Sequence, residues 1–481
     1  MRRRVLVRVL SLLLGIVALS MLPSLVLAFA EGEGRTVRAF ALPMGLALAG
    51  AAAAVFLGRK VSVRFGPADG FLLVSLAWIL TCFFGAVPFV LSGYLPNWSE
   101  AVFETVSGFT TTGASVFTDI EAVPRSVTFW RAMTHWLGGM GIVVLTVALL
   151  PLLGVGGFQL VKAEAPGPEK DKMTPKVGET AKILWIIYLA LTALQIALLM
   201  LGGMDWFEAT THAFATMATG GFGIKNASVG YYDSAWIDGV CTTFMVIAGA
   251  NFSLYYRVLQ GKVRDLFTNS EFRAYLGVFF ISSLAIAIAL LPTYGSFGKA
   301  FRYASFQSSS ILTTTGFATA NFDQWPEFAK MVLVILMLIG GCSGSTAGGI
   351  KVVRHVVLWK QAGNEMRRLL YPRGVFSVRL NGKVGRKDVV YGVAGFVFVY
   401  LALIFGVALV VASSGADVVT SLTGSLATVG NIGPGLGAVG PTMNYAAFPD
   451  YVTWVYSFGM LAGRLELWTL FILFKREFWR I

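Results

Sequence analysis

Apolar stretches of about 20 residues recur along this chain from end to end. A stretch of that length is enough to cross the hydrocarbon core of a bilayer as a helix. The sequence predicts ten spans, at 7–30, 39–58, 70–94, 128–154, 182–202, 235–258, 274–292, 327–358, 388–412 and 451–474. Only 13% of the residues are charged, against about 25% in a soluble domain. We therefore expect an all-α polytopic membrane protein.

The first span combines features of a signal peptide with the length of a membrane helix. It starts with the basic stretch MRRR and ends in Ala28-Phe29-Ala30, as a secretory signal peptide does. Its apolar part is long enough to cross the membrane and another span follows at once, so we expect a retained helix. If the start is cytoplasmic, most of the 38 Lys and Arg residues fall in loops on that side. The positive-inside rule then explains the net charge of +13 without a nucleic-acid partner, and predicts both termini in the cytoplasm.

The cysteines and histidines suggest no redox or metal chemistry. The three cysteines lie in apolar stretches without a CxxC spacing, and the three histidines are far apart in sequence: Cys82, Cys241, Cys342, His135, His212 and His355. We expect no cofactor and no transition-metal site.

Four shorter segments between the spans share one ending. The segments WSEAVFETVSGF, WFEATTHAFATM, FRYASFQSSSIL and VVTSLTGSL are too short to cross a bilayer and suit re-entrant helices. Irregular backbone at membrane depth must be buried in protein or line a water-filled cavity. Aligned without gaps, the endings each fit x-Thr-x-Gly: Thr110, Thr111, Thr112 and Gly113; Ala218, Thr219, Gly220 and Gly221; Thr313, Thr314, Thr315 and Gly316; Ala427, Thr428, Val429 and Gly430.

Four such strings on one axis would form rings of backbone carbonyl oxygens, which can replace the hydration shell of a potassium ion. Glycine permits the positive φ angles that turn carbonyls inward without a Cβ clash. The C-terminal ends of the short helices would also favour a cation. A single Thr-Thr-Thr-Gly string is weak evidence, since such turns also cap helices. Four strings in matched positions predict a repeat architecture.

The segment IGGCSGSTAGGIK, at 339–351, interrupts an otherwise apolar helix. Each glycine costs about 1 kcal/mol in a helix interior, so five of them with neighbouring Ser and Thr should break it. On the residues alone, a small-residue packing face with glycines every fourth position remains open. The candidate gating residues here are Gly340, Gly341, Ser343, Gly344, Ser345, Thr346, Gly348 and Gly349.

Arg464 lies inside the last predicted span. An arginine there costs at least about 2.5 kcal/mol, so it should face a partner or a water-filled path. Glu466 is two residues away and on another helix face. We therefore expect Arg464 to face a pore as a gating residue, or alternatively to pair with a carboxylate for helix packing. Lys351 is expected to mark the inner membrane surface.

Acidic residues flank the short segments on the outer side: Glu100, Glu104, Asp119, Glu121, Asp205 and Glu208. They could concentrate cations at a pore mouth. A solvated outer face explains them equally well.

The four strings, with ATGGFG at 218–223, ATVGNIGPG at 427–435, the broken helix and the late arginine, resemble the Trk/Ktr/HKT superfamily of potassium transporters over essentially the whole chain. The two extra N-terminal helices and the length are most similar to its bacterial TrkH branch. The resemblance implies a single-file pore in each subunit, built by four repeats in a pseudo-fourfold arrangement. The implied domains are a two-helix extension at 1–66 and pore repeats at 67–160, 161–265, 266–365 and 366–481, the third with a broken second helix.

The resemblance also implies K+ bound at the filter strings, with the glycine-rich loop obstructing the pore below them. It implies a homodimer in a bacterial inner membrane with one pore per protomer. A cytosolic TrkA-like regulatory subunit would carry the only nucleotide, of the NAD or ATP type, and dock on basic loops at 162–182, 256–273 and 351–387. Plant relatives that prefer sodium replace the first filter glycine with serine, whereas Gly113 stands here.

Three other functions are less consistent with the residues. A membrane-embedded enzyme would need a carboxylate cluster or a nucleophile–base pair in the spans, and the sequence has no such motif. An alternating-access transporter fits the broken helix but usually has twofold repeats. A sodium-permeable or cation-coupled symporter of the same architecture stays open.

Overall fold

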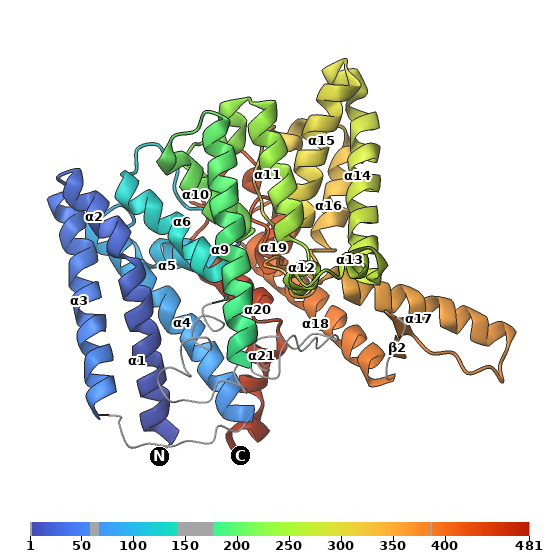
Figure 1. Cartoon of the computed structure of the whole chain (residues 1–481), viewed down its shortest axis with the longest axis horizontal. Helices are drawn as coiled ribbons and strands as arrows, with labels where there is room; N and C mark the ends of the chain where they lie inside the picture. Colours follow the sequence, from blue (N-terminus) through green and yellow to red (C-terminus); the bar gives the residue numbers. More distant parts are fainter. Residues whose placement is uncertain (1, 58–66, 142–176, 382, 385–386, 481) are drawn as a thin grey trace.

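The computed structural model describes residues 2–57, 67–141, 177–381, 383–384 and 387–480. Within these ranges, six helices are long and apolar enough to cross a membrane, and two bent helix pairs raise the number to eight. The sheet found in the described part is one antiparallel pair, β1 (Arg379–Leu380) with β2 (Lys383–Val384). The chain is thus an all-helical, multi-span membrane protein apart from this hairpin (Figure 1).

The N-terminal helices form one edge of the molecule (Figure 1). Helices α1 (Arg2–Ser20) and α2 (Leu22–Ala30) make one span through a turn at Met21, and α3 (Gly34–Leu57) returns beside α1. Val9, Leu13 and Val17 are buried in the core that this edge shares with the rest of the chain. The first span is therefore integrated into the fold.

The rest of the described chain contains four units with one order of elements: a long helix of 25–26 residues, then two shorter helices. By their order in the unit we call these the short helix (12–16 residues) and the medium helix (11–15 residues). The first unit has α4 (Pro67–Ser92), α5 (Trp98–Phe109) and α6 (Arg125–Gly139); the second has α9 (Val177–Leu201), α10 (Trp206–Met217) and α11 (Ala235–Ala248). The third has α14 (Ser270–Tyr294), α15 (Phe297–Leu312) and α16 (Glu327–Met337); the fourth has α18 (Lys387–Ala412), α19 (Val418–Val429) and α20 (Asp450–Arg464). Single 3-10 turns follow three of the short helices: η2 (Ser228–Tyr232), η3 (Phe322–Gln324) and η4 (Gly437–Val439).

The contacts between these helices close into a circle. In every unit the long helix packs on the short helix, and the short helix packs on the medium helix. The medium helix then contacts the short helix of the next unit: α6 on α10, α11 on α15, α16 on α19, and α20 back on α5. The four short helices are thus each held between two neighbouring units.

Polar side chains fix where three of the short helices begin. Asn97 accepts a hydrogen bond from the Ser99 N–H at the start of α5, and Asp417 accepts one from Thr420 at the start of α19. Asp205 and Glu208 form a reciprocal capping box on α10. These caps satisfy N–H groups that a helix start would otherwise leave unpaired.

Two of the four medium helices are followed by a sharp bend in the chain. The α11–α12 pair (α12, Phe252–Leu259) bends by 92° and the α20–α21 pair (α21, Trp468–Phe471) by 110°. The predicted spans at 235–258 and 451–474 therefore each correspond to a bent helix pair and not to one continuous helix. Asn251 caps α12 after a Gly-Ala turn, and two left-handed residues, Glu466 and Leu467, separate α20 from α21. The predicted span 128–154 continues beyond Gly141 into residues outside the described ranges.

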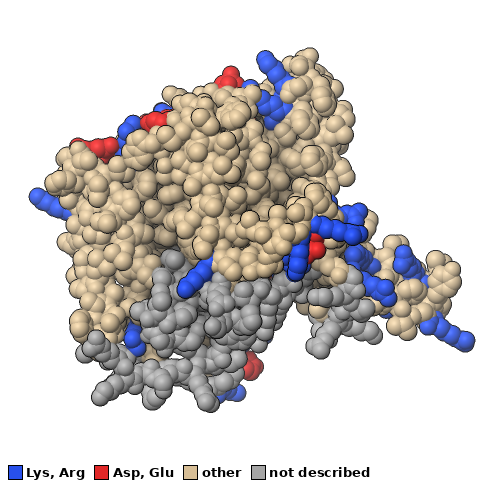
Figure 2. All heavy atoms as spheres, viewed as in Figure 1, with Lys and Arg blue, Asp and Glu red and all other residues tan. Residues whose placement is uncertain are grey.

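In the third unit, α16 ends at Met337 and the next helix, α17 (Val352–Leu370), begins 15 residues later. Helix α17 projects from the body at the lower right of Figure 1 and carries the Lys and Arg side chains seen there in Figure 2. The remaining elements are α13 (Val263–Thr268), η5 (Ile472–Phe474) and η6 (Arg476–Arg480). Both chain ends lie at one edge, and acidic and basic side chains are both seen at the opposite edge (Figures 1 and 2).

Candidate functional site

Each short helix ends in the same strained turn. The second residue after each helix has a left-handed backbone, and these residues are Thr111, Thr219, Thr314 and Asn431, with φ of 54°, 54°, 56° and 55°. The residue after it donates its N–H back to the carbonyl five positions earlier, as from Thr112 to Ser107 at 2.9 Å, and the three equivalent bonds measure 2.8 Å. A left-handed backbone costs a non-glycine residue roughly 1–2 kcal/mol and is unusual for β-branched threonine. Strain repeated at matched positions is typical of a functional site.

Four glycines close these turns into a ring of backbone. Gly113, Gly221, Gly316 and Gly433 have φ between 81° and 99°. A Cβ atom on each would approach a carbonyl oxygen of the next unit: Gly113 to Gly220 at 2.1 Å, Gly221 to Thr315 at 1.9 Å, Gly316 to Ile432 at 2.1 Å, and Gly433 to Thr112 at 2.7 Å. Since real Cβ atoms do not approach oxygen this closely, only glycine fits both the backbone angle and the space. We call the backbone of 110–113, 218–221, 313–316 and 430–433 the ring.

The fourth ring segment is Gly430, Asn431, Ile432 and Gly433, so the predicted segment is wrong by three residues. Ala427, Thr428 and Val429 form the last turn of α19, and Gly430 is its C-cap with φ −76°, as Thr110 is for α5. The letters of 427–430 match x-Thr-x-Gly, but the geometry requires a left-handed residue followed two positions later by glycine. Asparagine tolerates that backbone better than most residues, so Asn431 stands where the other units have threonine.

The ring carries side-chain oxygens as well as carbonyls. In the first and third units the outer hydroxyls of each Thr-Thr-Thr pair with each other at 2.7 Å, Thr110 with Thr112 and Thr313 with Thr315. Among the described residues, the buried Thr111 hydroxyl has no hydrogen-bond partner, nor does the Oδ1 atom of Asn431. Two oxygen atoms at equivalent ring positions are therefore available to a ligand.

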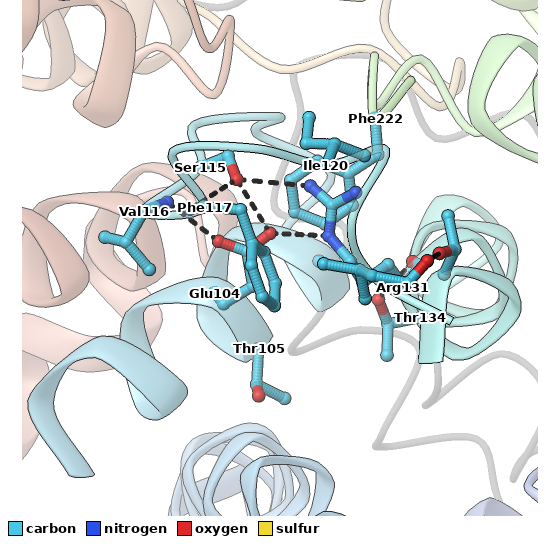
Figure 3. A network of polar contacts seen from close by, with 12 residues as sticks. Glu104, Thr105, Ser115, Val116, Phe117, Ile120, Arg131, Thr134 and Phe222 are labelled. Atoms are coloured by element: carbon cyan, nitrogen blue, oxygen red, sulfur yellow. Dashed lines mark hydrogen bonds and ion pairs between the residues drawn. The ribbon is translucent and has the colours of Figure 1, made fainter. Parts of the chain in front are cut away.

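A buried ion pair binds the backbone that follows the first two ring segments (Figure 3). The Nε of Arg131 on α6 lies 2.7 Å from Oε1 of Glu104 on α5, and the two side chains are 1% and 0% exposed. Glu104 also accepts hydrogen bonds from the Val116 N–H and the Ser115 hydroxyl, just beyond the first ring segment. Arg131 donates to the carbonyl oxygen of Gly223 in the second unit at 3.2 Å. The pair thus connects the backbone on the outer side of two ring segments.

His135, one turn after Arg131 on α6, makes a second link between the same units. Its Nε2 accepts the Phe222 N–H at 3.1 Å, so its Nδ1 carries the proton and donates to the Gly108 carbonyl oxygen at 2.7 Å. The imidazole of His135 also stacks on the phenyl group of Phe222, with centroids 4.0 Å apart. Sequence reasoning missed Arg131 and His135, although a charged residue and a histidine inside a predicted span were a usable signal.

The glycine-rich segment forms a loop rather than a helix, so the alternative of a small-residue helix face is excluded. Gly340, Gly344 and Gly349 all have φ between 72° and 81°. Gly340 and Gly349 meet at the neck of the loop, where a Cβ on Gly349 would lie 2.8 Å from the Gly340 Cα. Backbone hydrogen bonds tie the loop to the α11–α12 bend: Cys342 N to Gly249 O at 2.8 Å, and Phe252 N to Gly344 O at 3.0 Å.

The tip of this loop touches the helix-end side of the ring. The Gly348 N–H donates to the Thr314 hydroxyl at 2.6 Å. The Thr346 hydroxyl donates to the Met217 carbonyl oxygen at 3.0 Å, and the Thr219 hydroxyl lies 3.4 Å from it. Within the loop, the Ser345 hydroxyl donates to the Cys342 carbonyl oxygen, next to Ser343. Gly341 packs against Ala347. The loop therefore contacts two of the three strained threonines directly, Thr219 and Thr314.

Arg464, the last residue of α20, joins the loop to the first unit. Its guanidinium donates to the Thr346 carbonyl oxygen at 2.7 Å and to the Gly138 and Gly139 carbonyl oxygens at 2.8 and 3.3 Å. It therefore lies beside the loop on the same side of the ring.

Two neighbouring charges lie elsewhere than the sequence suggested. Lys351 is only 8% exposed and donates from Nζ to the Ala347 carbonyl oxygen, so the prediction that it marks the membrane surface is wrong. Glu466 forms an ion pair with Arg354 at the start of α17, and that guanidinium lies 3.8 Å from the centre of the Phe396 ring. The bend after α20 is thereby tied to the far end of the loop.

Five of the six predicted outer acidic residues make structural contacts: Glu104, Asp119, Glu121, Asp205 and Glu208. Glu104 is buried, Asp205 and Glu208 cap α10, and Glu121 lies 3.6 Å from Lys225. Hydrogen bonds from the Asn226 side chain and the Glu121 backbone lower the pKa of Asp119. For Glu104 the interpretation as a surface charge at a pore mouth is wrong.

Comparison with known proteins gives one consistent result. The sequence model of the TrkH family, described as cation transport proteins, matches residues 38–481. The Trk system potassium uptake protein TrkH of Escherichia coli K12 is 40% identical over 489 residues, and its relative from Halomonas elongata is 38% identical over 488, each match covering 100% of both chains. The crystal structure of the potassium transporter TrkH from Vibrio parahaemolyticus superposes with a TM-score of 0.89 at 36% identity, over 100% of both chains. The prediction of a transporter and not an enzyme is confirmed: this chain belongs to the TrkH family of cation transport proteins.

Proposed function

We propose that this protein is the pore subunit of a Trk-type potassium uptake system, in which K+ crosses the membrane through the ring. The observation that carries the proposal is the closed series of glycine-to-carbonyl approaches around four consecutive units. Such a ring of backbone oxygens is the chemistry that replaces the hydration shell of K+. The names of the relatives, each a Trk system potassium uptake protein, support the same ion.

The four units are pore repeats in a pseudo-fourfold arrangement. Their proposed bounds are 67–160, 161–265, 266–365 and 366–481, after a retained two-helix extension at 1–66. The circle of contacts from α6 on α10 round to α20 on α5 supports this arrangement. The same strained turn at the end of each short helix supports it independently.

The carbonyl oxygens that the glycines approach belong to Thr112, Gly220, Thr315 and Ile432. These residues, with the strained residue before each of them, are the proposed K+ ligands. The C-terminal ends of α5, α10, α15 and α19 point their carbonyl dipoles toward the same region, which favours a cation. In this list, residues of the segment 430–433 take the place of the predicted residues 427–430.

The 338–351 loop and Arg464 form the gate in this proposal. Gly348 and Thr346 contact ring threonines, and Arg464 adds a fixed positive charge that opposes the approach of a cation. Potassium flow therefore requires the loop to leave the ring and Arg464 to move with it.

The assembly is proposed from family membership. It is a homodimer in a bacterial inner membrane, with both termini cytoplasmic and with a cytosolic TrkA-like subunit that binds the regulatory nucleotide. The chain itself needs no cofactor and no nucleic acid. Its basic segments at 256–273 and 351–387 offer a surface for the regulator, while most of the third predicted docking loop, 162–176, lies outside the described residues.

The test is rubidium-86 uptake into liposomes that contain the purified protein, with potassium, sodium or lithium as competitors. We expect potassium to compete strongly and sodium weakly, and Gly113→Ser to reduce that difference by about tenfold, or about 1.4 kcal/mol. Gly203→Ser is the matched control, because Gly203 also has a positive φ of 99° but no atom within 4 Å of its Cβ position. Equal competition by sodium in the unchanged protein would contradict potassium selectivity, and absence of rubidium flux would contradict the pore.

A further inference from the structure

Glu271 is a buried carboxylate that the proposed ion path does not use. It lies in the first turn of α14 and is 2% exposed. The Asn269 side chain caps this helix, accepting the N–H groups of Glu271 and Phe272 at 3.0 Å each. The cap fixes the first turn of the helix, so the position of the carboxylate is determined by the backbone of the third unit.

One oxygen of Glu271 holds both sides of the gate loop. Its Oε1 accepts the Ser343 N–H at 2.6 Å and the Val353 N–H at 3.2 Å. Ser343 lies in the first half of the loop, after the end of α16, and Val353 is the second residue of α17. The segment between them contains Thr346 and Gly348, which touch the ring. This single oxygen thus accepts two backbone hydrogen bonds across the base of the loop, one from each side.

The residue before Glu271 connects the same turn to the β-hairpin. The Ser270 N–H and hydroxyl both donate to Oδ1 of Asn381, at 2.8 and 3.0 Å. Asn381 is exposed and follows β1, and the Arg379 carbonyl oxygen in β1 accepts a hydrogen bond from Lys360 of α17. Two consecutive residues of α14 thus bind the gate loop on one side and a surface hairpin on the other.

We propose that Glu271 is a positioning residue that clamps the loop closed, and that displacement of the α14 start through the Asn381 contact releases it. This inference rests on the proposed function, since it assigns the part that holds the gate. The clamp acts on the loop and not on the ring, so its loss should change the amount of flux without changing ion preference.

The test uses the full-length protein in liposomes without a regulatory subunit. Glu271→Leu removes the acceptor, and we expect it to raise rubidium-86 uptake about tenfold through a larger open population. Glu271→Gln keeps an amide oxygen of the same reach, and we expect uptake within about twofold of the unchanged protein. Potassium-over-sodium competition should be the same in all three proteins.

Native cysteines give a second readout that does not depend on transport. Cys342 is next to Ser343, and Cys82 is equally buried, each 1% exposed. In single-cysteine versions, Glu271→Leu should speed maleimide labelling of Cys342 while Cys82 stays unlabelled. Unchanged uptake together with unchanged Cys342 labelling would overturn the clamp, as would labelling of both cysteines, which indicates unfolding.

A different set of results would contradict the proposed function itself. If no protein in the set carries rubidium while Cys342 still becomes reactive in Glu271→Leu, the pore assignment is wrong and the gating role of Glu271 falls with it. If the unchanged protein conducts and Arg464→Ala conducts more, but Glu271→Leu does not, only the clamp is overturned.

Discussion

At the scale of single residues, the ring depends on side chains that never reach its axis. Arg131 and His135, one helical turn apart on α6, hold backbone groups of Gly223 and Phe222 in the second unit. Glu104 neutralises Arg131 and fixes Val116 in the first unit. Because both charges are fully buried, each depends on the other, and removal of one leaves an uncompensated charge.

Arg131→Met should destabilise the protein strongly. Breaking a buried pair from one side typically costs about 3–5 kcal/mol, and the double variant Arg131→Met with Glu104→Gln should recover part of the loss. The measurement is thermal unfolding in detergent followed by size-exclusion chromatography. Arg368→Met is the control, because its partner Glu365 and Arg368 itself are 50% and 44% exposed, and such surface pairs contribute at most about 1 kcal/mol. Equal effects of Arg131→Met and Arg368→Met would contradict this role of the buried pair.

The sequence predicts the ring residues of three units but not the side chains behind them. Thr110–Gly113 and its two clear copies are recognisable because strain and close approach restrict which residues fit. Arg131 and Glu104 are 27 positions apart, and only the packing of α6 on α5 shows that they are partners. The fourth segment is predicted three residues too early, at 427–430, because Asn431 takes the place of threonine.

At the scale of elements, the breaks after the medium helices provide contacts for the proposed gate. The α11–α12 bend supplies backbone partners for the loop, and the α20–α21 bend places Arg464 beside it and Glu466 against α17. The glycines of 339–351 predict the interruption in the third unit. The other bends depend on tertiary contacts such as Arg354–Glu466, which stabilise left-handed residues that local sequence disfavours.

Arg464→Ala should raise rubidium uptake, since it removes both the positive charge and three hydrogen bonds to the loop and α6. We expect an increase of about tenfold, equivalent to about 1.4 kcal/mol. Arg464→Lys keeps the charge but not the planar fork, so its uptake should lie between those of the unchanged protein and Arg464→Ala. If the lysine and alanine variants conduct equally, the charge itself makes no contribution to the barrier.

At the scale of the whole molecule, the proposed orientation places both termini in the cytoplasm. Both chain ends lie at the lower edge of Figure 1, and the upper edge carries both acidic and basic side chains in Figure 2. The segments after the ring, such as η2, are on the side opposite the termini, and α17 and the hairpin are on the side of the termini. The composition predicts this arrangement, because basic loops stay in the cytoplasm.

Cysteine labelling in intact cells tests this orientation. After replacement of the three native cysteines, Tyr231→Cys in η2 should react with an impermeant maleimide from outside. Val375→Cys, after α17, should react only once the membrane is permeabilised. These positions are 54% and 98% exposed, so accessibility does not limit either reaction. The reverse pattern would contradict cytoplasmic termini.

The central claim is that four strained turns form one cation-binding ring. Anomalous diffraction from crystals grown with rubidium in place of potassium tests it most directly. We expect anomalous density on the ring axis, within coordination distance of the Thr112, Gly220, Thr315 and Ile432 carbonyl oxygens, and weaker density in Gly113→Ser. Rubidium density elsewhere in the protein with none on this axis would contradict the assignment of the ring.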